Sequence, residues 1–193
     1  MRDFLLAVAD RLAASDLAAA QDVAAGLRPL ARDLAESAID VPHLACALAQ
    51  PNRVALADHL GALTGHLNWE DHRDWTDIPL PFRHQFAYCE LVGPDGAIAA
   101  ESFRMGLYLQ YPNSFYPLHN HEAEETYLTL SGTAHWWRDG VIDSPVPPGS
   151  LFRHAPFERH ATRTGGEPLL AVWTWTGAIG SGSYTCDPEP PGG

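Results

Sequence analysis

The spacing of hydrophobic residues changes along the chain, from a helical repeat in the first third to an alternating repeat further on. Near the start, Phe4, Leu5, Val8 and Leu12 recur every three or four residues, which is the spacing of one face of an α-helix. This third of the chain is also rich in alanine and leucine. We therefore expect residues 1–67 to form a small N-terminal helical bundle.

Capping residues and prolines divide this region into short helices. Ser15 and Asp16 interrupt the first repeat and offer a new N-cap. Pro29 stands where a further helical run can begin, and Pro51 and Asn52 end another. The helices expected after the first are one that follows Asp16, one from Pro29 to about Ile39, one from Pro42 to Ala49 and one from Val54 to Leu63.

The second part of the chain reads as β-structure. Residues 68–81 mix Trp, Asp, His and Pro and are typical of a linker. Beyond them, β-forming residues stand between turn signals, and we place a β-domain at 82–187, followed by a flexible Pro/Gly-rich tail at 188–193. Short strands at this spacing indicate an antiparallel barrel or sandwich. The strands expected are 86–92, 102–111, 126–130, 134–138, 151–154 and 169–175.

Charge and cysteine content narrow the range of functions. The net charge is −12 without any Lys/Arg cluster, so nucleic acid and anionic membrane surfaces are disfavoured as partners. No stretch approaches the roughly 20 apolar residues of a membrane span. No signal-peptide cleavage pattern follows the first residues, so a cytoplasmic location is the default expectation. Cys46, Cys89 and Cys186 are too far apart to indicate a zinc ribbon or a disulfide framework.

One segment carries the residues of a metal site. His119 and His121 are two apart, so on a strand both side chains share a face. Glu125 and Tyr127 form a second such pair further along. Imidazole and carboxylate together suit zinc, iron, manganese, cobalt or nickel better than calcium. The segment therefore predicts a single divalent transition-metal ion.

This segment resembles the first motif of the cupin family, in which His-x-His, three residues, Glu, six residues and Gly follow one another. His119, His121, Glu125 and Gly132 meet every spacing, while Asn113 replaces the glycine that opens the motif. Asn tolerates the left-handed backbone that such a position uses. The resemblance implies a mainly β fold, the cupin double-stranded β-helix or jelly-roll barrel.

A second cupin motif, Gly, five residues, Pro-x-Gly, two residues and His, is met in part. Gly149 and His160 occupy its outer positions, but Ala155 and Phe157 stand where proline and glycine are usual. The loop is therefore expected to differ in shape and still to deliver His160 as a fourth ligand. His154, which lies outside the register of the motif, is the rival ligand.

Phenols and other aromatic residues surround the ligand motif. Tyr127 follows Glu125 by two residues and should face the metal, and Tyr116 precedes His119 by three. A phenol beside a dication has a lowered pKa, so it can bind the metal or act as a general base. An aromatic cage also holds a sulfonium or quaternary ammonium cation. We expect the following residues to line a substrate site: Tyr108, Trp136, Trp173 and Trp175.

The segment 116–127, behind a helical N-terminal part, is similar to the cupin-type dimethylsulfoniopropionate lyases, especially those of the DddQ type. This resemblance implies a β-elimination that gives dimethyl sulfide and acrylate from a zwitterionic sulfonium carboxylate. It implies His121, Glu125 and His160 as ligands with His119 beside them. Tyr127 is then the base, or a metal ligand at rest, and Tyr116 a second catalytic or anchoring phenol.

Two other functions fit the same motif. An iron-dependent cupin dioxygenase uses a similar ligand set with open positions for oxygen. A non-catalytic zinc-binding cupin that acts as a sensor needs a partner-binding surface, which the helices could supply. Oxygen consumption and partner co-purification separate these from a lyase. Cupins commonly pair through barrel edges, so a homodimer is a further prediction of the resemblance.

Overall fold

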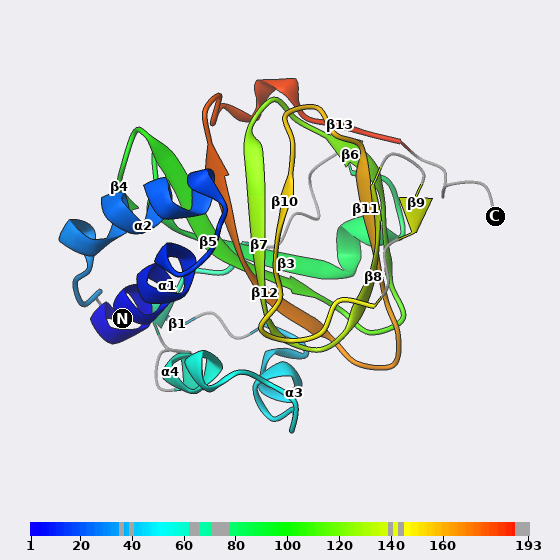
Figure 1. Cartoon of the computed structure of the whole chain (residues 1–193). Coiled ribbons are helices and arrows are strands. Elements are labelled where there is room, and N and C mark those ends of the chain that lie inside the picture. The colour runs from blue at the N-terminus through cyan, green and yellow to red at the C-terminus, as the bar shows by residue number, and fades with distance from the viewer. Residues whose placement is uncertain are drawn as a thin grey trace.

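The computed structural model describes residues 1–34, 37–38, 41–61, 66–70, 78–138, 141–142 and 145–187. Two β-sheets face each other in a barrel, and the helices lie outside it (Figure 1). The helices are α1 (Arg2–Ala13), α2 (Ala18–Leu30), α3 (Leu44–Leu48) and α4 (Asp58–Gly61), with 3-10 turns η1 (Ala55–Ala57), η2 (Phe82–His84) and η3 (Ser181–Ser183). The strands are β1 (Ser37–Ala38), β2 (His66–Leu67), β3 (Phe86–Gly93), β4 (Ile98–Ala99), β5 (Phe103–Gln110), β6 (Phe115–Asn120), β7 (Glu124–Ser131), β8 (Ala134–Arg138), β9 (Val141–Ile142), β10 (Leu151–His154), β11 (His160–Thr164), β12 (Leu169–Thr176) and β13 (Thr185–Cys186).

The strand order gives the barrel its topology. Six strands form one sheet in the order β10-β7-β12-β5-β3-β4, and five form the other in the order β13-β6-β11-β8-β9. Pairing is antiparallel in both sheets except between β3 and β4. Because β6 and β7 are consecutive but belong to different sheets, the chain crosses from one sheet to the other between them. The fold is thus the mainly β cupin jelly roll, with an N-terminal helical segment, that the sequence predicts.

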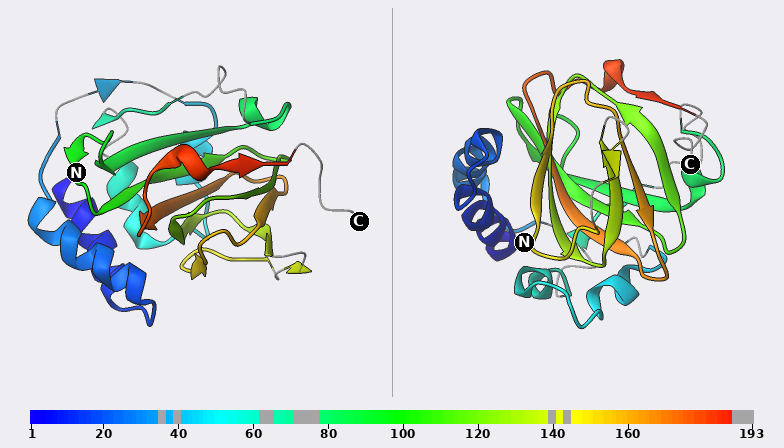
Figure 2. Two further views of the ribbon diagram at one scale, coloured as in Figure 1. Left: turned by 90° about the horizontal axis from the view of Figure 1, so that it is seen from above. Right: turned by 45° about the vertical axis from the view of Figure 1, so that its right-hand side comes forward.

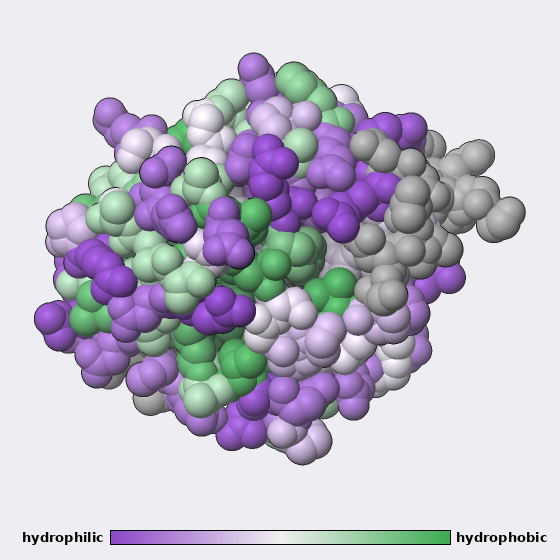
Figure 3. Space-filling view, viewed as in Figure 1, coloured by the Kyte–Doolittle hydropathy of each residue, from purple (hydrophilic) through white to green (hydrophobic). Residues whose placement is uncertain are grey.

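The six-stranded sheet packs against the helices on its outer face and against an aromatic cluster inside the barrel on its inner face. Leu107 and Leu109 pack in one hydrophobic cluster with residues of α1 and α2, such as Val8 and Leu27. Tyr108, between the two leucines, belongs to a second, aromatic cluster that fills the barrel. Figure 2 shows α1 and α2 against the outside of the barrel, and Figure 3 shows a mixture of hydrophilic and weakly hydrophobic residues on their outer side. The apolar alternation in β5 therefore faces the helices, and aromatic and polar residues line the interior.

The contact between the helices and the sheet is expected to supply much of the stability. Leu107 is fully buried in it, so Leu107→Ala should lower the free energy of unfolding by about 2–5 kcal/mol. Leu80→Ala, at a leucine that is 64% exposed, should change it by less than about 0.5 kcal/mol. Urea unfolding followed by circular dichroism measures both. Equal losses in the two variants would contradict this view of the core.

One predicted helix is wrong. Among the described residues of the helix predicted from Pro29 to Ile39, Pro29 lies in the last turn of α2, 31–34 have no regular structure, and 37–38 form β1. The φ angle of proline suits a helix, and its missing N–H removes one bond just before α2 ends. Ala31 then takes an extended ψ of 112°. The proline thus marks a helix end, where the sequence suggested a start.

Two predicted strands are confirmed, whereas the predicted linker and tail lie partly or wholly outside the described residues. The strands predicted at 134–138 and 151–154 coincide with β8 and β10. Of the predicted linker, 71–77 lie outside the described residues, and the described Trp69 and Ile78 are buried. The predicted tail, 188–193, also lies outside them, so the division into domains stays a prediction. None of the helices in the described part of the chain has the length and apolar character needed to cross a membrane.

Candidate metal centre and cavity

Strands from both sheets bring three metal-binding side chains together. His160 begins β11, Glu125 lies in β7, and His121 lies just before β7. Their ligand atoms all lie within 4.8 Å of one another, the one such group among the described residues. The Nε2 atoms of His121 and His160 are 3.3 and 3.2 Å from Oε2 of Glu125. The structure therefore gathers three of the four predicted ligands.

Backbone carbonyls orient the histidine rings of this centre. The Nδ1 atoms of His119, His121 and His160 lie 2.8, 3.1 and 2.8 Å from the carbonyl oxygens of Pro117, Ala123 and Glu158. A carbonyl only accepts a hydrogen bond, so in each neutral ring Nδ1 carries the proton and Nε2 keeps its lone pair. The Nε2 lone pairs of His121 and His160 then face a buried carboxylate. Such a convergence of acceptors fits a cation.

Glu125 is the anionic member of the group. Burial alone raises its pKa, but hydrogen bonds and positive charge from His121 and His160, in the form that carries a proton on Nε2, hold the pKa well below the usual value. Its second oxygen, Oε1, accepts a hydrogen bond of 2.9 Å from the indole N–H of Trp175. The carboxylate is thus ionised and fixed in orientation by a neighbour on the adjoining strand. Two imidazoles and one carboxylate suit the divalent transition metals rather than calcium.

The other two predicted histidines lie beside the group. His119 pairs with His160 across β6 and β11, and the two rings meet edge to face with centroids 4.0 Å apart. Burial and the nearby His160 lower the pKa of His119 well below its ordinary value, so its ring is neutral. His154 stacks on the other side of His160, at 4.0 Å and 8°. Neither nitrogen of the buried His154 has a hydrogen-bond partner within the described part of the chain.

Two of the three departures from the cupin pattern, Asn113 before β6 and Phe157 in the loop before His160, stand at positions with a positive φ. Asn113 has a φ of +54° and Phe157 a φ of +60°, so both adopt the left-handed conformation that the usual glycines provide. The amide of Phe157 donates a hydrogen bond of 2.8 Å to the carbonyl of His121. The loop therefore accommodates a bulky side chain at a left-handed position, and whether its shape differs from that of the usual motif stays a prediction.

Tyr127 projects from the same face of β7 as Glu125 and lines the cavity. Its ring packs against Trp136, with centroids 4.8 Å apart, and against Phe152 at 5.8 Å. Burial raises the pKa of Tyr127 well above its ordinary value, and the charge of Glu125 raises it further. Its phenol is therefore neutral in the protein without a cation.

Tyr116 is held by a hydrogen bond between two phenols. Its hydroxyl lies 2.7 Å from that of Tyr184, and its ring stacks on His119 at 3.8 Å and on Phe82 at 4.3 Å. Burial raises the pKa of Tyr116 well above its usual value, against the lowering effect of the bond to Tyr184. Tyr184 follows η3 and was not predicted, because no local motif marks it.

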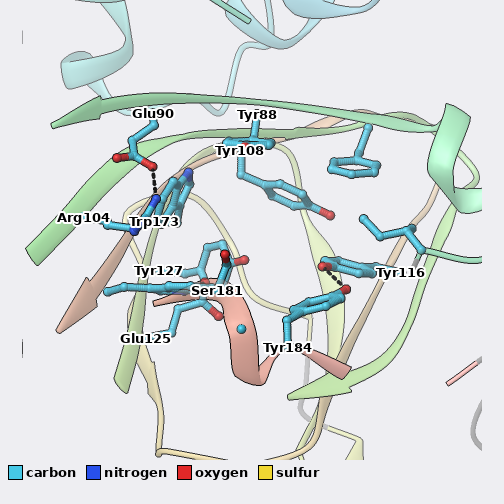
Figure 4. A pocket seen from close by; sticks show the side chains of 14 residues that line it. Tyr88, Glu90, Arg104, Tyr108, Tyr116, Glu125, Tyr127, Trp173, Ser181 and Tyr184 are labelled. Atoms are coloured by element: carbon cyan, nitrogen blue, oxygen red, sulfur yellow. Dashed lines mark hydrogen bonds and ion pairs between the residues drawn. The ribbon is translucent and has the colours of Figure 1, made fainter. Parts of the chain in front are cut away.

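Tyr116, Glu125 and Tyr127 line a cavity with a volume of about 520 Å³. Of the predicted aromatic residues, Tyr108, Trp173 and Trp175 line it, and Figure 4 labels Tyr108 and Trp173. Trp136 is not among the lining residues and packs against Tyr127 instead. The sequence did not predict several other lining residues, which come together only through strand pairing. These are Ile78, Phe86, Tyr88, Glu90, Arg104, Ser181, Gly182 and Tyr184.

The donor set predicts metal binding that depends on His121. We expect the wild-type protein to bind about one equivalent of Zn²⁺ per chain, and His121→Ala to bind less than one tenth as much, because first-sphere ligands carry the affinity. His59→Ala, at an exposed histidine of α4, serves as the matched control and should keep its metal. Elemental analysis after dialysis measures both. Equal zinc in His121→Ala and the wild type would contradict the assignment.

Comparison with known proteins gives the family. The sequence profile of the dimethylsulfoniopropionate lyases matches residues 8–171. A DddL protein of Cereibacter sphaeroides is 35% identical over 122 residues, which are 62% of this chain and 50% of DddL. Dimethylsulfoniopropionate lyase DddQ of Ruegeria pomeroyi is 29% identical over 136 residues, 70% of this chain and 67% of DddQ. The matched region thus spans half the length of DddL and about two thirds of DddQ.

Solved structures agree with this likeness. The crystal structure of the lyase DddQ from Ruegeria pomeroyi has a TM-score of 0.71 and 26% identity, and the match covers 100% of this chain and 98% of that one. A crystal structure from a study of the lyases RdDddP and RnDddQII also has a TM-score of 0.71, at 24% identity, and covers 96% and 97% of the two chains. The second match bears on the fold alone. Because the family profile covers most of its length, the chain belongs to the dimethylsulfoniopropionate lyase family.

Proposed function

We propose that this protein is a metal-dependent lyase that cleaves dimethylsulfoniopropionate into dimethyl sulfide and acrylate. One observation carries the proposal: the phenol of Tyr127 and the carboxylate of Glu125, which belongs to the metal-binding group, line a single aromatic cavity. The family of the chain supports the same reaction. We infer that His121, Glu125 and His160 hold one divalent transition-metal ion, with His119 as the neighbouring nitrogen donor.

The elimination needs a base near the carbon next to the substrate carboxylate. The oxygen of Tyr127, as phenolate, takes a proton from that carbon. The electron pair left behind forms the carbon–carbon double bond of acrylate, while the carbon–sulfur bond breaks and its pair leaves with sulfur as neutral dimethyl sulfide. No oxidant or reductant takes part. Because burial raises the pKa of Tyr127, its phenolate is a strong base once formed.

The metal-binding group explains how such a phenolate can exist near neutral pH. A bound dication supplies positive charge that offsets the developing charge on the substrate carboxylate and lowers the pKa of a nearby phenol. Tyr116, fixed by Tyr184, serves as a second phenol that anchors the substrate. The faces of Tyr108, Trp173 and Trp175 hold the sulfonium through cation–π attraction until the sulfide leaves. The packing of Trp136 against Tyr127 gives Trp136 a supporting role behind these faces.

Proton NMR of a reaction under nitrogen tests this proposal. The zinc-loaded protein should convert dimethylsulfoniopropionate into equal amounts of acrylate and dimethyl sulfide, since elimination consumes no oxygen. A reaction that needs oxygen, or one that gives other products, would contradict the lyase. The cytoplasmic location and the homodimer remain predictions from the sequence.

A further inference from the structure

Glu90 and Arg104 form a buried ion pair on the cavity wall, on the side opposite the Tyr116–Tyr184 pair (Figure 4). One terminal nitrogen of Arg104 donates to Oε2 of Glu90 at 2.7 Å and to Oδ2 of Asp95 at 2.9 Å. Its Nε donates to the carbonyl of Ile179 at 2.9 Å. The side chain of Glu90 is 4% exposed and that of Asp95 is 73% exposed. The pair is thus built into the barrel, and Asp95 lies at its outer edge.

Strand register places this pair close enough to act on a small substrate. Glu90 stands opposite Gly106, Gly106 opposite Trp173, and Trp173 opposite Tyr127 on successive strands. Neighbouring strands lie about 4.8 Å apart, so the backbones of Glu90 and Tyr127 are about 14 Å apart, and their side chains converge inward. A molecule lying over Trp173 therefore has Tyr127 on one side and Glu90 on the other.

Gly106 leaves room between Glu90 and Tyr127 for the indole ring of Trp173. A Cβ at this position would lie 2.1 Å from the carbonyl oxygen of Cys89 and 2.8 Å from Nε1 of Trp173. Backbone cannot yield at such a distance, so a side chain is excluded here. The face of Trp173 can consequently meet the substrate between the ion pair and the base.

The charges at this side of the cavity favour a cation. Glu90, Arg104 and Asp95 together carry two negative charges and one positive charge. Burial works to lower the pKa of Arg104, but its hydrogen bonds to Glu90 and Asp95 raise that pKa above the ordinary value, so the guanidinium is charged and compensated. The metal-binding group, when loaded with a dication, has the opposite sign. A zwitterion with a carboxylate at one end and a cation at the other matches this arrangement.

We propose that Glu90, held in place by Arg104, determines specificity by attracting the cationic end of an onium carboxylate over the face of Trp173. This inference rests on the proposed function, because it names what recognises the sulfonium end of the substrate in the same cavity. Glu90 is a binding residue and transfers no proton. The preference it creates is for a positive charge, independent of whether the charge sits on sulfur or nitrogen.

Isothermal titration calorimetry of the zinc-loaded protein tests the inference without turnover. The two probes are 3-(trimethylammonio)propanoate and 4,4-dimethylpentanoate, which have the same shape and differ by one positive charge. The wild type should bind the cationic probe at least about tenfold more tightly, as expected of a buried carboxylate near a charge. Glu90→Gln should reduce this preference about tenfold. Asp58→Asn removes the same formal charge at an exposed aspartate of α4, which pairs with Arg53 and does not line the cavity, and it should keep the preference within about twofold.

The outcomes separate the inference from the lyase proposal. Equal affinity of the wild type for the two probes would overturn the inference whether or not the variants fold, and so would an undiminished preference in folded Glu90→Gln. If Glu90→Gln does not fold, Arg104→Gln takes its place, and its preference for the cationic probe should rise. Release of dimethyl sulfide without a charge preference would leave the lyase standing and reject Glu90. A preference that depends on Glu90, without release of dimethyl sulfide, would support the role of Glu90 and reject the lyase.

Discussion

Tyr127→Phe is expected to lower the rate of dimethyl sulfide release at least about 100-fold, since a positioned general base contributes 10²–10⁴-fold. The substitution removes one oxygen and leaves the ring in its packing against Trp136 and Phe152. The zinc content and the circular dichroism spectrum should therefore stay close to those of the wild type. Headspace gas chromatography measures the rate, and elemental analysis the metal.

Tyr111→Phe is the matched control for this result. Tyr111 packs against His43, with ring centroids 4.8 Å apart, and does not line the cavity. Its loss of a hydroxyl should leave the rate within about twofold. A Tyr127→Phe protein with wild-type turnover would show that another group removes the proton, and Tyr116 would be the next to replace.

Glu125→Gln is expected to remove both the metal and the activity. The amide keeps the shape of the side chain but loses the charge that faces Nε2 of His121 and His160. Because the carboxylate is the one anionic donor of the group, zinc content should fall below about one tenth of an equivalent, and dimethyl sulfide release to background.

The neighbouring glutamate supplies the control for this variant. Glu124 lies on the other face of β7, where its Oε2 accepts a hydrogen bond of 2.7 Å from Arg153. This bond lowers the pKa of Glu124, so the residue is also ionised. Glu124→Gln removes the same charge one position away and should keep both zinc and activity. Loss of metal in both variants to the same degree would mean that overall charge, and not coordination, governs binding.

Three of the four predicted ligands meet in the structure, and they lie in two local motifs that the sequence alone displays. His121 and Glu125 are four apart, and the spacing from Gly149 to His160 carries through a loop whose Phe157 adopts the glycine-like conformation. The strands at 134–138 and 151–154 were also predicted, since alternation and flanking turns are local signals. Such local features can be predicted without knowing how the strands pair in the barrel.

Features that depend on long-range pairing were missed. Glu90 and Arg104 are 14 residues apart and meet through the β3–β5 register, and Tyr184 reaches Tyr116 across 68 residues. Both faces of β5 are buried, one against the helices and one in the barrel, so the alternation in this strand does not tell which side lines the cavity. Pro29 was read as a helix start because proline is common in the first turn of a helix, but it stands in the last turn of α2.

Gas chromatography of the headspace above a sealed, oxygen-free mixture of the protein and dimethylsulfoniopropionate tests the central claim most directly. We expect the protein with verified zinc content to release dimethyl sulfide, removal of the metal by a chelator to stop the release, and added zinc to restore it. Absence of dimethyl sulfide from folded, metal-loaded protein, or undiminished release after complete removal of the metal, would show that the protein is not a metal-dependent lyase.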